Sequence, residues 1–498
     1  MKTDPTLTTE INEAKGEAYE LSLQQRIVWR LQQRQLFPNP QVTLQLQDVL
    51  DEEALSVALR CIWERHEALR TVFPRVAGLT VPLQSVVDQS FPCWSSHDLR
   101  HLTIVEQQFQ IEQLAQSQRL TPFDLEHGPL ARLMLIHLDT HNHLLLITVP
   151  AICMDRRSLK NLAAEVGLFY ASPVSGLSQE PPLQYIDYAQ WQAELLTSSD
   201  ADAQTGRGFW NEQPEIAIDT VQYPHTKTFQ NEHRICHALN VQVLDPALSA
   251  ALEALAKQCE VSYGVILETL WGVLLSRWTD TSLLTLGHEC EGRSHAELNG
   301  AIGIFAKVLP IRFHIDLSNP LLSLFYKADI AIDEATGWQD FHDPEHVGSN
   351  EALLYTFAYE EWADTSEPTS FSISALNTAP MPFALGVRCL HGNVSTRLEW
   401  QYDSEVYSED AIHHMALCYE ALLRSAVKTP DANLGLLEMA PQVDRDKLLG
   451  DWNASDREYG EEVCIHQLFE TAARTYPNAL ALVVEDQQLT FQQLNTRA

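Results

Sequence analysis

Segments with the pattern of helices and of buried strands alternate along this chain, and they do so on both sides of a Pro/Ser/Gly-rich stretch at residues 172–182. Residues 51–64 have apolar residues at helical spacing and acidic residues in the first turn. Residues 143–149 (HLLLITV) have the β-rich composition of a buried strand, bounded by Asn142 and Pro150. A single hydrophobic core stops growing near ~250–300 residues. The 498 residues are therefore expected to form two similar α/β lobes.

The rest of the sequence predicts further helices and strands, and its composition changes near the C-terminus. Further helices are predicted at 105–119, from Ser158 onward, at 246–258 and at 262–278, and strands at 282–288 and 306–314. Residues 441–460 are polar and rich in turn formers, which indicates a linker. Residues 465–498 then begin a new pattern that stops in mid-helix, so we expect a fragment of a longer polypeptide.

Charge and cysteine usage exclude several classes of function. Lys and Arg total 33 against 67 Asp and Glu, a formal net charge of −34, which disfavours nucleic acid and anionic membranes as partners. The most apolar stretch, 144–154, is far shorter than the ~20 residues of a membrane span. Residues 1–20 lack the apolar core of a signal peptide. The nine cysteines are scattered without a CxxC pair, which predicts reduced thiols and a cytoplasmic protein.

Several spaced motifs carry a resemblance to one family. They are LSLQQRIVW at 21–29, RHEALRTVF at 65–73, YIDYAQW at 185–191, Gly292-Arg293, IGIF at 302–305 leading to Pro310-Ile311-Arg312, and Trp338-Gln339-Asp340. In this order they resemble the condensation domains of nonribosomal peptide synthetases over roughly residues 20–435. The tail, from Leu489-Thr490-Phe491 to Leu494-Asn495, resembles the first core motif of an adenylation domain.

The resemblance implies a fold and a domain plan. The expected fold class is α/β, with two chloramphenicol-acetyltransferase-like lobes in a V-shaped pseudo-dimer and a tunnel between them. The expected plan is a leader at 1–20, an N-terminal lobe at 21–177, a C-terminal lobe at 178–438, a linker at 439–462 and the truncated start of an adenylation domain at 463–498. Carrier proteins of the family insert phosphopantetheine arms from opposite faces, so no cofactor is expected in the fragment itself.

The catalytic motif of the family is where this sequence departs from it. The family has HHxxxDG after a first-lobe strand, and its second His orients or deprotonates the attacking amine. Pro150 replaces the first His here, Ala151 the second and Arg156 the Gly, while Asp155 is retained. Alanine has no ionisable group, and losing a positioned acid or base typically removes ~10²–10⁴-fold in rate. The motif therefore predicts no catalytic residue at this position.

Two further family positions bear on the site. In the family, the retained acid and the Arg of the GR motif form a structural ion pair, which implies a pair between Asp155 and Arg293. Lys307 occupies the Asn position of the family's FVNT motif, close to the tunnel, where a Lys does not fit an unmodified substrate channel and is expected to extend to water or pair with a carboxylate. The DxxxxDxxS motif of heterocyclisation domains is not matched either, because Pro150 stands in place of its first Asp.

Other reactive side chains offer no clear substitute for the missing base. His141 and His143 are expected at the exposed start of a strand, His66 in a structural role, and the pair His413-His414 on a helix surface. Cys153 has no identifiable base and is interpreted as a small buried residue. His288-Glu289-Cys290 lacks further spaced ligands, so no metal site is predicted.

These observations leave three hypotheses open. The first is a catalytically inactive condensation-like domain that recruits an in-trans tailoring enzyme, such as an amino-acid β-hydroxylase or a P450, to act on a carrier-bound amino acid. The family includes such recruitment domains, which combine degraded motifs with an intact scaffold. The second is a vestigial spacer before the adenylation domain. The third is an amide-forming domain that works by substrate positioning alone. The expected partners are a carrier protein, the adenylation domain and, under the first hypothesis, an oxygenase.

Overall fold

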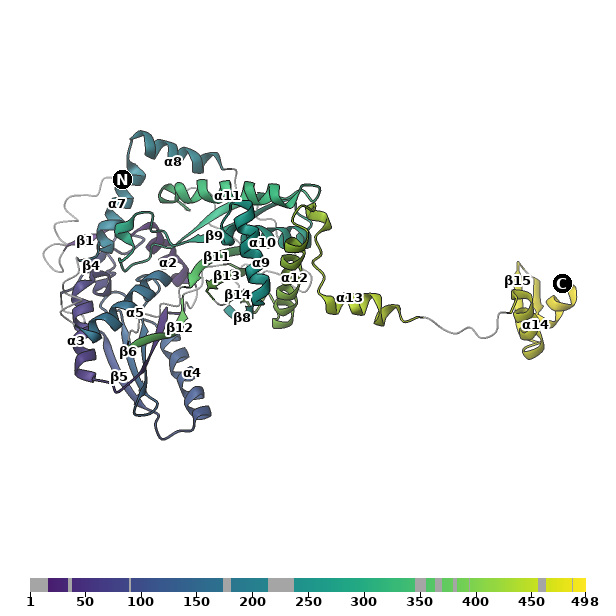
Figure 1. The fold of residues 1–498 in the computed structure, drawn as a ribbon, viewed down its shortest axis with the longest axis horizontal. Coiled ribbons are helices and arrows are strands. Elements are labelled where there is room, and N and C mark those ends of the chain that lie inside the picture. The colour runs from purple at the N-terminus through teal and green to yellow at the C-terminus, as the bar shows by residue number, and fades with distance from the viewer. Residues whose placement is uncertain are drawn as a thin grey trace. The chain divides into compact units, whose positions relative to one another are not determined.

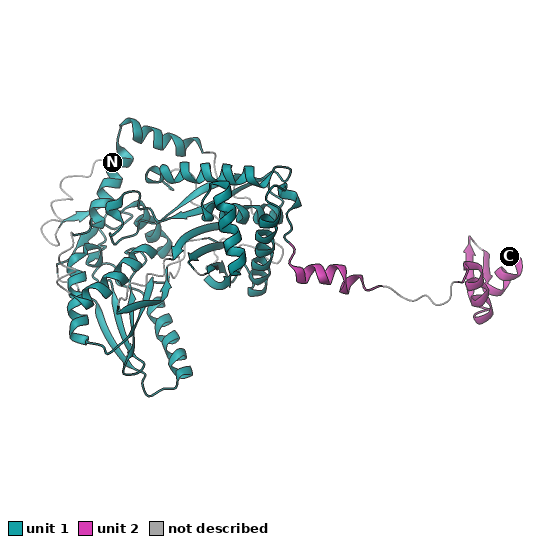
Figure 2. Cartoon of the chain, viewed as in Figure 1, with its two compact units in different colours: residues 1–439 teal, residues 440–498 magenta. Residues whose placement is uncertain are grey.

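A computed structural model gives the fold of the protein. It describes residues 17–34, 38–88, 91–172, 181–213, 237–344, 355–362, 370–378, 383–393, 395–455, 463–485 and 487–498. The chain forms two compact units, residues 1–439 and residues 440–498 (Figure 2). Most of the predicted leader (1–16) and of the Pro/Ser/Gly-rich stretch (173–180) lies outside the described residues, as does part of the predicted linker (456–462).

The first layer of the larger unit is built on a five-stranded sheet (Figure 1). Its strands, in spatial order, are β12 (Phe371–Asn377), β2 (Gln41–Gln47), β7 (Asn142–Thr148), β6 (Arg132–His137) and β5 (Cys93–Asp98). Helices α3 (Glu52–Arg65) and α5 (Arg156–Ala171) pack together, and α5 also contacts β2 and β12. Strand β7 is buried along almost its whole length, so the predicted strand at 143–149 is confirmed within one residue.

Local signals explain where the helices of this layer begin. Helix α3 begins after Asp51, whose carboxylate accepts a hydrogen bond from the Ala54 backbone N–H at 3.0 Å, and its first turn carries two acidic residues, which favours the positive end of the helix dipole. Helix α4 (Ile104–Leu120) begins with a capping box between Thr103 and Glu106. Both helices were expected from the sequence, and their bounds differ from the prediction by one residue at each end.

The second layer is a six-stranded sheet covered by long helices. Its strands, in spatial order, are β10 (Lys307–His314), β9 (Leu283–Cys290), β11 (Tyr355–Trp362), β13 (Leu385–Gly392), β14 (Thr396–Asp403) and β8 (His237–Val243). The covering helices are α9 (Pro246–Cys259), α10 (Tyr263–Thr279), α11 (Leu321–Gly337) and α12 (Glu409–Lys428). Helix α10 is buried on every side from Tyr263 to Ser276, as an all-round apolar helix must be.

Two segments of the predicted C-terminal lobe (178–438) belong to the first layer. Strand β12 pairs antiparallel with β2, so residues 371–377 complete the first sheet. Helix α7 (Tyr185–Thr197) places Tyr185 and Tyr188 in the core of the first layer, with the Phe305 ring 5.0 Å and 4.7 Å from theirs. The two predicted lobes are therefore connected by exchanged segments and do not separate at one point of the sequence.

Shorter elements complete the larger unit. They are β1 (Ala18–Tyr19), β4 (Gln84–Val86) and β3 (Thr71–Val72) in a small sheet, with α2 (Leu23–Arg34) and α8 (Ala201–Glu212). Strand β1 lies within the predicted leader, whose last residues are thus part of the folded body. Among the described helices, none alone has the length and apolarity of a membrane span; α9 and α10 meet that test only together, across a bend of 101°.

The smaller unit contains α13 (Gln442–Leu449), α14 (Ile465–Thr475) and α15 (Phe491–Arg497), with a two-stranded sheet of β15 (Leu480–Val484) and β16 (Gln487–Thr490). Helix α13 lies where a turn-rich linker was predicted. Its eight residues include two Leu and a Lys near the C-terminal end, and these are good helix formers. The Pro, Asp and Gly residues of the segment had suggested turns instead.

Candidate functional site: the turn between β7 and α5

The degenerate motif forms the turn that connects strand β7 to helix α5. Strand β7 ends at Thr148, and the Cys153 N–H donates to the carbonyl of Pro150 at 3.0 Å, which closes the turn. Proline suits this position because its fixed φ and missing N–H end a strand. Ala151 is only 1% exposed, so the position of the family's base carries a buried methyl group.

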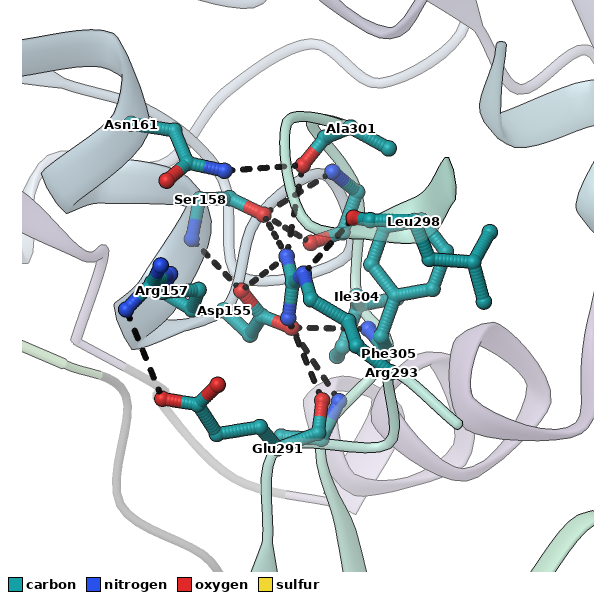
Figure 3. A network of polar contacts seen from close by, with 12 residues as sticks. Asp155, Arg157, Ser158, Asn161, Glu291, Arg293, Leu298, Ala301, Ile304 and Phe305 are labelled. Atoms are coloured by element: carbon teal, nitrogen blue, oxygen red, sulfur yellow. Dashed lines mark hydrogen bonds and ion pairs between the residues drawn. The ribbon is translucent and has the colours of Figure 1, made fainter. Parts of the chain in front are cut away.

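Asp155 is the centre of a dense hydrogen-bond network (Figure 3). It is the N-cap of α5, where its Oδ1 accepts from the Ser158 N–H at 2.8 Å. Its Oδ2 accepts from the N–H groups of Phe305 and Ala306, at 2.8 and 3.1 Å. Burial opposes the charged form, but the charge and hydrogen bonds of Arg293 outweigh it and hold the pKa of Asp155 below its usual value.

Arg293 lies against the same carboxylate and completes the network. Its Nη1 is 2.9 Å from Asp155 Oδ2, its Nη2 is 3.2 Å from Oδ1, and the two side chains are 1% and 4% exposed. The guanidinium also donates to Ser158 Oγ and to the carbonyl oxygens of Leu298 and Ala301. The pair that the resemblance implied is thus in bidentate contact, the strongest geometry for such a pair.

Gly292 makes the close approach of Arg293 to Asp155 possible. Gly292 has φ +67°, and a Cβ at this position would lie 1.8 Å from the carbonyl oxygen of Phe305. The chain can therefore bend sharply just before Arg293 and bring the segment 302–305 against the turn. Ser158 Oγ donates to the Gly303 carbonyl at 2.7 Å and accepts from the Gly303 N–H at 3.0 Å. The GR and IGIF motifs are in this way attached to the start of α5.

Arg156 extends from the turn toward the second sheet. Its Nε donates to Glu360 Oε2 on β11 at 2.7 Å, and Lys160 of α5 pairs with the same carboxylate. Arg388 on β13 forms an ion pair with Glu289 on β9 at 2.6 Å. Burial and the nearby Arg388 lower the pKa of Arg156 to about 10, so it stays charged at neutral pH. The residue that replaces the motif glycine therefore bridges the two layers.

The space beside the motif is small. Ala151, Met154, Asp155, Arg156 and Arg388 are among the residues that line a cavity of about 70 Å³. A second void of about 40 Å³ adjoins Arg156, Lys160, Glu289, Glu360 and Arg388. Pockets that enclose small-molecule ligands usually measure ~300–1,000 Å³. Neither of these two voids has the volume for a thioester-bearing arm, although Arg156 also lines a larger cavity, of about 680 Å³, between the first sheet and the edge of the second.

Lys307, the fourth altered position, points away from both voids. Its Nζ donates to the carbonyl of Gln339 at 3.2 Å and pairs with the carboxylate of Asp340, and its side chain is only 4% exposed. The expected partner carboxylate thus exists and belongs to the Trp338-Gln339-Asp340 motif. The expected place in the tunnel is not supported, because the neighbours Ala306 and Val308 line the cavity beside Ala151, whereas Lys307 does not.

The other candidate side chains lie elsewhere. His66 donates to or accepts from Glu165 at 2.6 Å in the core, and His413 and His414 are exposed on α12. Burial raises the pKa of the Cys153 thiol well above its usual value. The prediction for His143 was wrong: it is 6% exposed and its Nδ1 lies 3.0 Å from that of His137. Strand β6 pairs with β7 and places His137 directly opposite His143, which no local pattern indicates.

Metal ligation finds no support, since the described residues contain no group of three or more His, Cys, Asp or Glu that could hold an ion. His288 contacts Glu268 at 2.8 Å. Glu360 and Arg388 were not predicted as part of the site from the sequence. A signal was present, because Glu360 directly follows a largely apolar run in its strand (YTFAYEEW) and Arg388 lies inside an apolar one (LGVRCL). A charge in such a place requires a partner.

The fold and this turn together define the class. The condensation domain of the Monacolin K polyketide synthase MokA matches the structure with a TM-score of 0.71 at 19% identity, covering 84% of this chain and 99% of that one. A chain in the complex of the X-domain and OxyB from teicoplanin biosynthesis matches with 0.69 at 20% identity, covering 86% and 97%. The predicted condensation-domain fold is confirmed.

The family follows from the sequence. The model of the condensation domain matches residues 15–449, and the chain belongs to this family. Chondramide synthase cmdD of Chondromyces crocatus is 28% identical over 477 residues, which cover 90% of this chain and 12% of that protein. Tyrocidine synthase 2 of Brevibacillus parabrevis is 27% identical over 510 residues, covering 98% and 14%. The chain thus corresponds to a small part of these multidomain synthases.

Proposed function

We propose that this protein is a catalytically inactive condensation domain that recruits a tailoring enzyme to a nonribosomal peptide synthetase. The recruited enzyme, an oxygenase such as an amino-acid β-hydroxylase, would modify the amino acid while it is bound to the phosphopantetheine of a carrier protein. The domain would supply proximity and no chemistry. The observation that carries the proposal is the combination of Ala151 at the base position with an intact Asp155–Arg293 network.

The loss of chemistry rests on two features. The buried methyl of Ala151 neither takes up a proton nor orients an amine. In addition, Arg156, Glu360 and Lys160 form ion pairs where substrates would have to pass, and the voids beside them measure only about 40 and 70 Å³. Removing these charges from their pairs is costly in a buried place. The buried methyl of Ala151 and the ion pairs beside it therefore argue against the alternative of amide formation by positioning alone.

The retention of scaffold favours recruitment over a vestigial spacer. The Asp155–Arg293 pair, the Ser158 contacts to Gly303 and the Tyr185 hydroxyl bond to the Ile304 carbonyl at 2.7 Å hold both layers in a defined arrangement. Such a body offers the ~800 Å² per partner that a specific interface buries. A solved structure of the same fold is a complex of an X-domain with OxyB. With a charge of −34, the surface favours a basic partner, and association should weaken as salt rises.

The first experiment tests inactivity. Loaded donor and acceptor carrier proteins are mixed with the protein and followed by intact mass spectrometry. We expect no condensed product, with an active condensation domain as the positive control. Condensation at the rate of that control would contradict the proposal.

The second experiment tests recruitment. The co-encoded oxygenase acts on the loaded carrier in three synthetase variants: intact, lacking residues 1–439, and with these residues replaced by an active condensation domain of the same fold. We expect modification and a stable complex on gel filtration only with the intact protein. Equal modification in all three would exclude recruitment, and modification lost only in the deletion would indicate a spacer.

A further inference from the structure

Strand β8 forms one edge of the second sheet (Figure 1), and among the described strands only β14 pairs with it. This pairing runs without a register shift along the whole of β8, and the Leu244 N–H continues it by donating to the Thr396 carbonyl at 2.9 Å. The hydrogen bonds of an antiparallel pair use alternate residues. Leu239, Val241 and Val243 therefore direct their N–H and C=O groups away from β14, which leaves this edge with free backbone donors and acceptors.

The edge lacks the features that keep natural sheet edges from pairing with other chains. Such edges usually carry a Lys or another charged residue, a Pro, or a β-bulge. The sequence of β8 (HALNVQV) contains no proline and no acidic or basic residue other than His237, whose pKa burial lowers to about 4. The other edges differ, because β10 contains Pro310 and Arg312, β5 contains Asp98, and β12 has a register shift. Among the described edges of the two large sheets, β8 alone is open to a further strand.

The side chains of β8 add an apolar row beside this free backbone. Leu239, Val241 and Val243 are 53%, 45% and 60% exposed. They alternate with residues that face the covering helices, such as Gln242, which donates to the Ala416 carbonyl of α12 at 3.2 Å. Leu239 also lines the cavity of about 680 Å³, but neither valine does. A free strand edge with alternate apolar side chains is the surface that an added β-strand covers.

The order of the residues in β8 identifies the added strand. Around Val241, the strand has the same chemical character in both directions. The amides Asn240 and Gln242 flank it, and the apolar Leu239 and Val243 come next on either side. In an antiparallel pair of two copies centred on Val241, apolar residues would lie opposite apolar residues and amides opposite amides, with no like charges face to face.

A two-fold interface between identical chains requires such self-complementarity, whereas a strand from a different protein does not. We propose that β8 pairs with β8 of a second copy of this chain, antiparallel and about a two-fold axis at Val241. The second sheets of the two copies would then form one continuous sheet.

The net charge opposes this dimer, and salt should favour it. Each copy carries a formal charge of −34, and the Debye length falls from about 30 Å at 0.01 M salt to about 8 Å at 0.15 M. A contact of one strand per copy is also smaller than the ~800 Å² per partner of a standard stable complex. We therefore expect a weak dimer whose Kd decreases as salt rises. Binding of a basic tailoring enzyme should show the opposite salt dependence, so the two proposals can fail independently.

The first test is sedimentation equilibrium of the full chain, from about 50 mM to about 500 mM salt. We expect a monomer–dimer equilibrium that shifts toward the dimer at high salt. Val241→Lys should raise the Kd at least about 10-fold, because it places two like charges opposite each other on the axis. The control Val105→Lys changes a valine on α4 that is 78% exposed and should leave the Kd unchanged. Far-UV circular dichroism and melting temperatures verify that the variants are folded.

The second test is disulfide cross-linking, which reads the register. In Val241→Cys the two introduced thiols would face each other, at the Cα separation of about 5.5 Å that a disulfide can span. In Val243→Cys each thiol would face the partner's Leu239, and the two thiols would be about 13 Å apart along the strands, too far to link. The natural protein, with exposed Cys93 and Cys464, sets the background, and peptide mapping identifies the bond.

The proposal predicts a cross-linked dimer for Val241→Cys alone. A monomer at every salt concentration, an unchanged Kd of the Val241→Lys protein, or equal cross-linking of the two cysteine variants would overturn it. A monomer that binds the co-encoded oxygenase, and loses this binding in the Val241→Lys variant, would assign the edge to that enzyme and overturn the dimer.

Discussion

Replacing Asp155 by alanine should destabilise the larger unit severely. The carboxylate accepts hydrogen bonds from the backbone N–H groups of Ser158, Phe305 and Ala306 and is bidentate with Arg293. Its loss strands a buried guanidinium, and breaking a buried pair in this way costs ~3–5 kcal/mol. Each backbone N–H left without an acceptor lowers the stability further, although the individual losses cannot simply be summed. We expect Asp155→Ala to lower the free energy of unfolding by about 4 kcal/mol.

The control is Asp98→Ala, which breaks an exposed pair with Arg100 whose side chains are 51% and 54% exposed. Exposed pairs contribute ~0–1 kcal/mol. Unfolding of both variants by guanidinium is followed through tryptophan fluorescence, with the natural protein alongside. If Asp155→Ala costs no more than Asp98→Ala, the network does not hold the layers together and the reasoning is refuted.

The Asp155–Arg293 pair should also make the stability of the protein depend on pH. Since the folded-state pKa of Asp155 is lowered, its contribution is fully present above the unfolded-state value of ~4 and is lost as pH falls through the lower folded-state value. The difference in stability between the natural protein and Asp155→Ala should therefore be constant from pH 5 to 7 and shrink below pH 4. A difference that grows on acidification would contradict the assignment of a charged Asp155.

Three further predictions concern the same region. Gly292→Ala should destabilise the protein by at least ~1–2 kcal/mol in guanidinium unfolding, from its φ of +67° alone. The control Gly208→Ala, with nothing within 4 Å of the added Cβ, should be neutral or stabilising. Equal effects of the two substitutions would exclude the close approach of Gly292 to the Phe305 carbonyl. Pro150→His combined with Ala151→His should not yield condensed product by intact mass spectrometry, because Arg156, which is paired with Glu360, and Lys307, which is paired with Asp340, still depart from the family's pattern. Turnover in that double variant would show that these two departures do not prevent catalysis. Cys153, whose thiol pKa is raised by burial, should resist iodoacetamide in the native protein while exposed Cys93 and Cys464 react, and rapid labelling of Cys153 in peptide mapping would show that the turn opens.

Local sequence signals predicted many of the helices and strands. The predictions that failed concern contacts between residues that are far apart in the sequence. The helices at 246–258 and 262–278 correspond to α9 and α10 because caps and apolar spacing are written in neighbouring residues. The burial of His143 depends on contacts with other strands, and the ion pair of Arg156 depends on Glu360, which is 204 residues away in the sequence. No local pattern encodes such pairings, so the sequence could identify the altered motif but not what fills the space around it.

The pairing of β12 with β2 has a consequence for how the protein reaches its native state. During synthesis from the N-terminus, β2 must wait for residues 371–377 to leave the ribosome before its second edge is hydrogen-bonded. Until then β2 is an unpaired edge of the first sheet, with Val42, Leu44 and Leu46 on its core face, and unpaired edges can associate with other chains. Contacts across such a sequence separation also slow folding. Nascent chains of this protein therefore need protection from aggregation until most of the larger unit has been made.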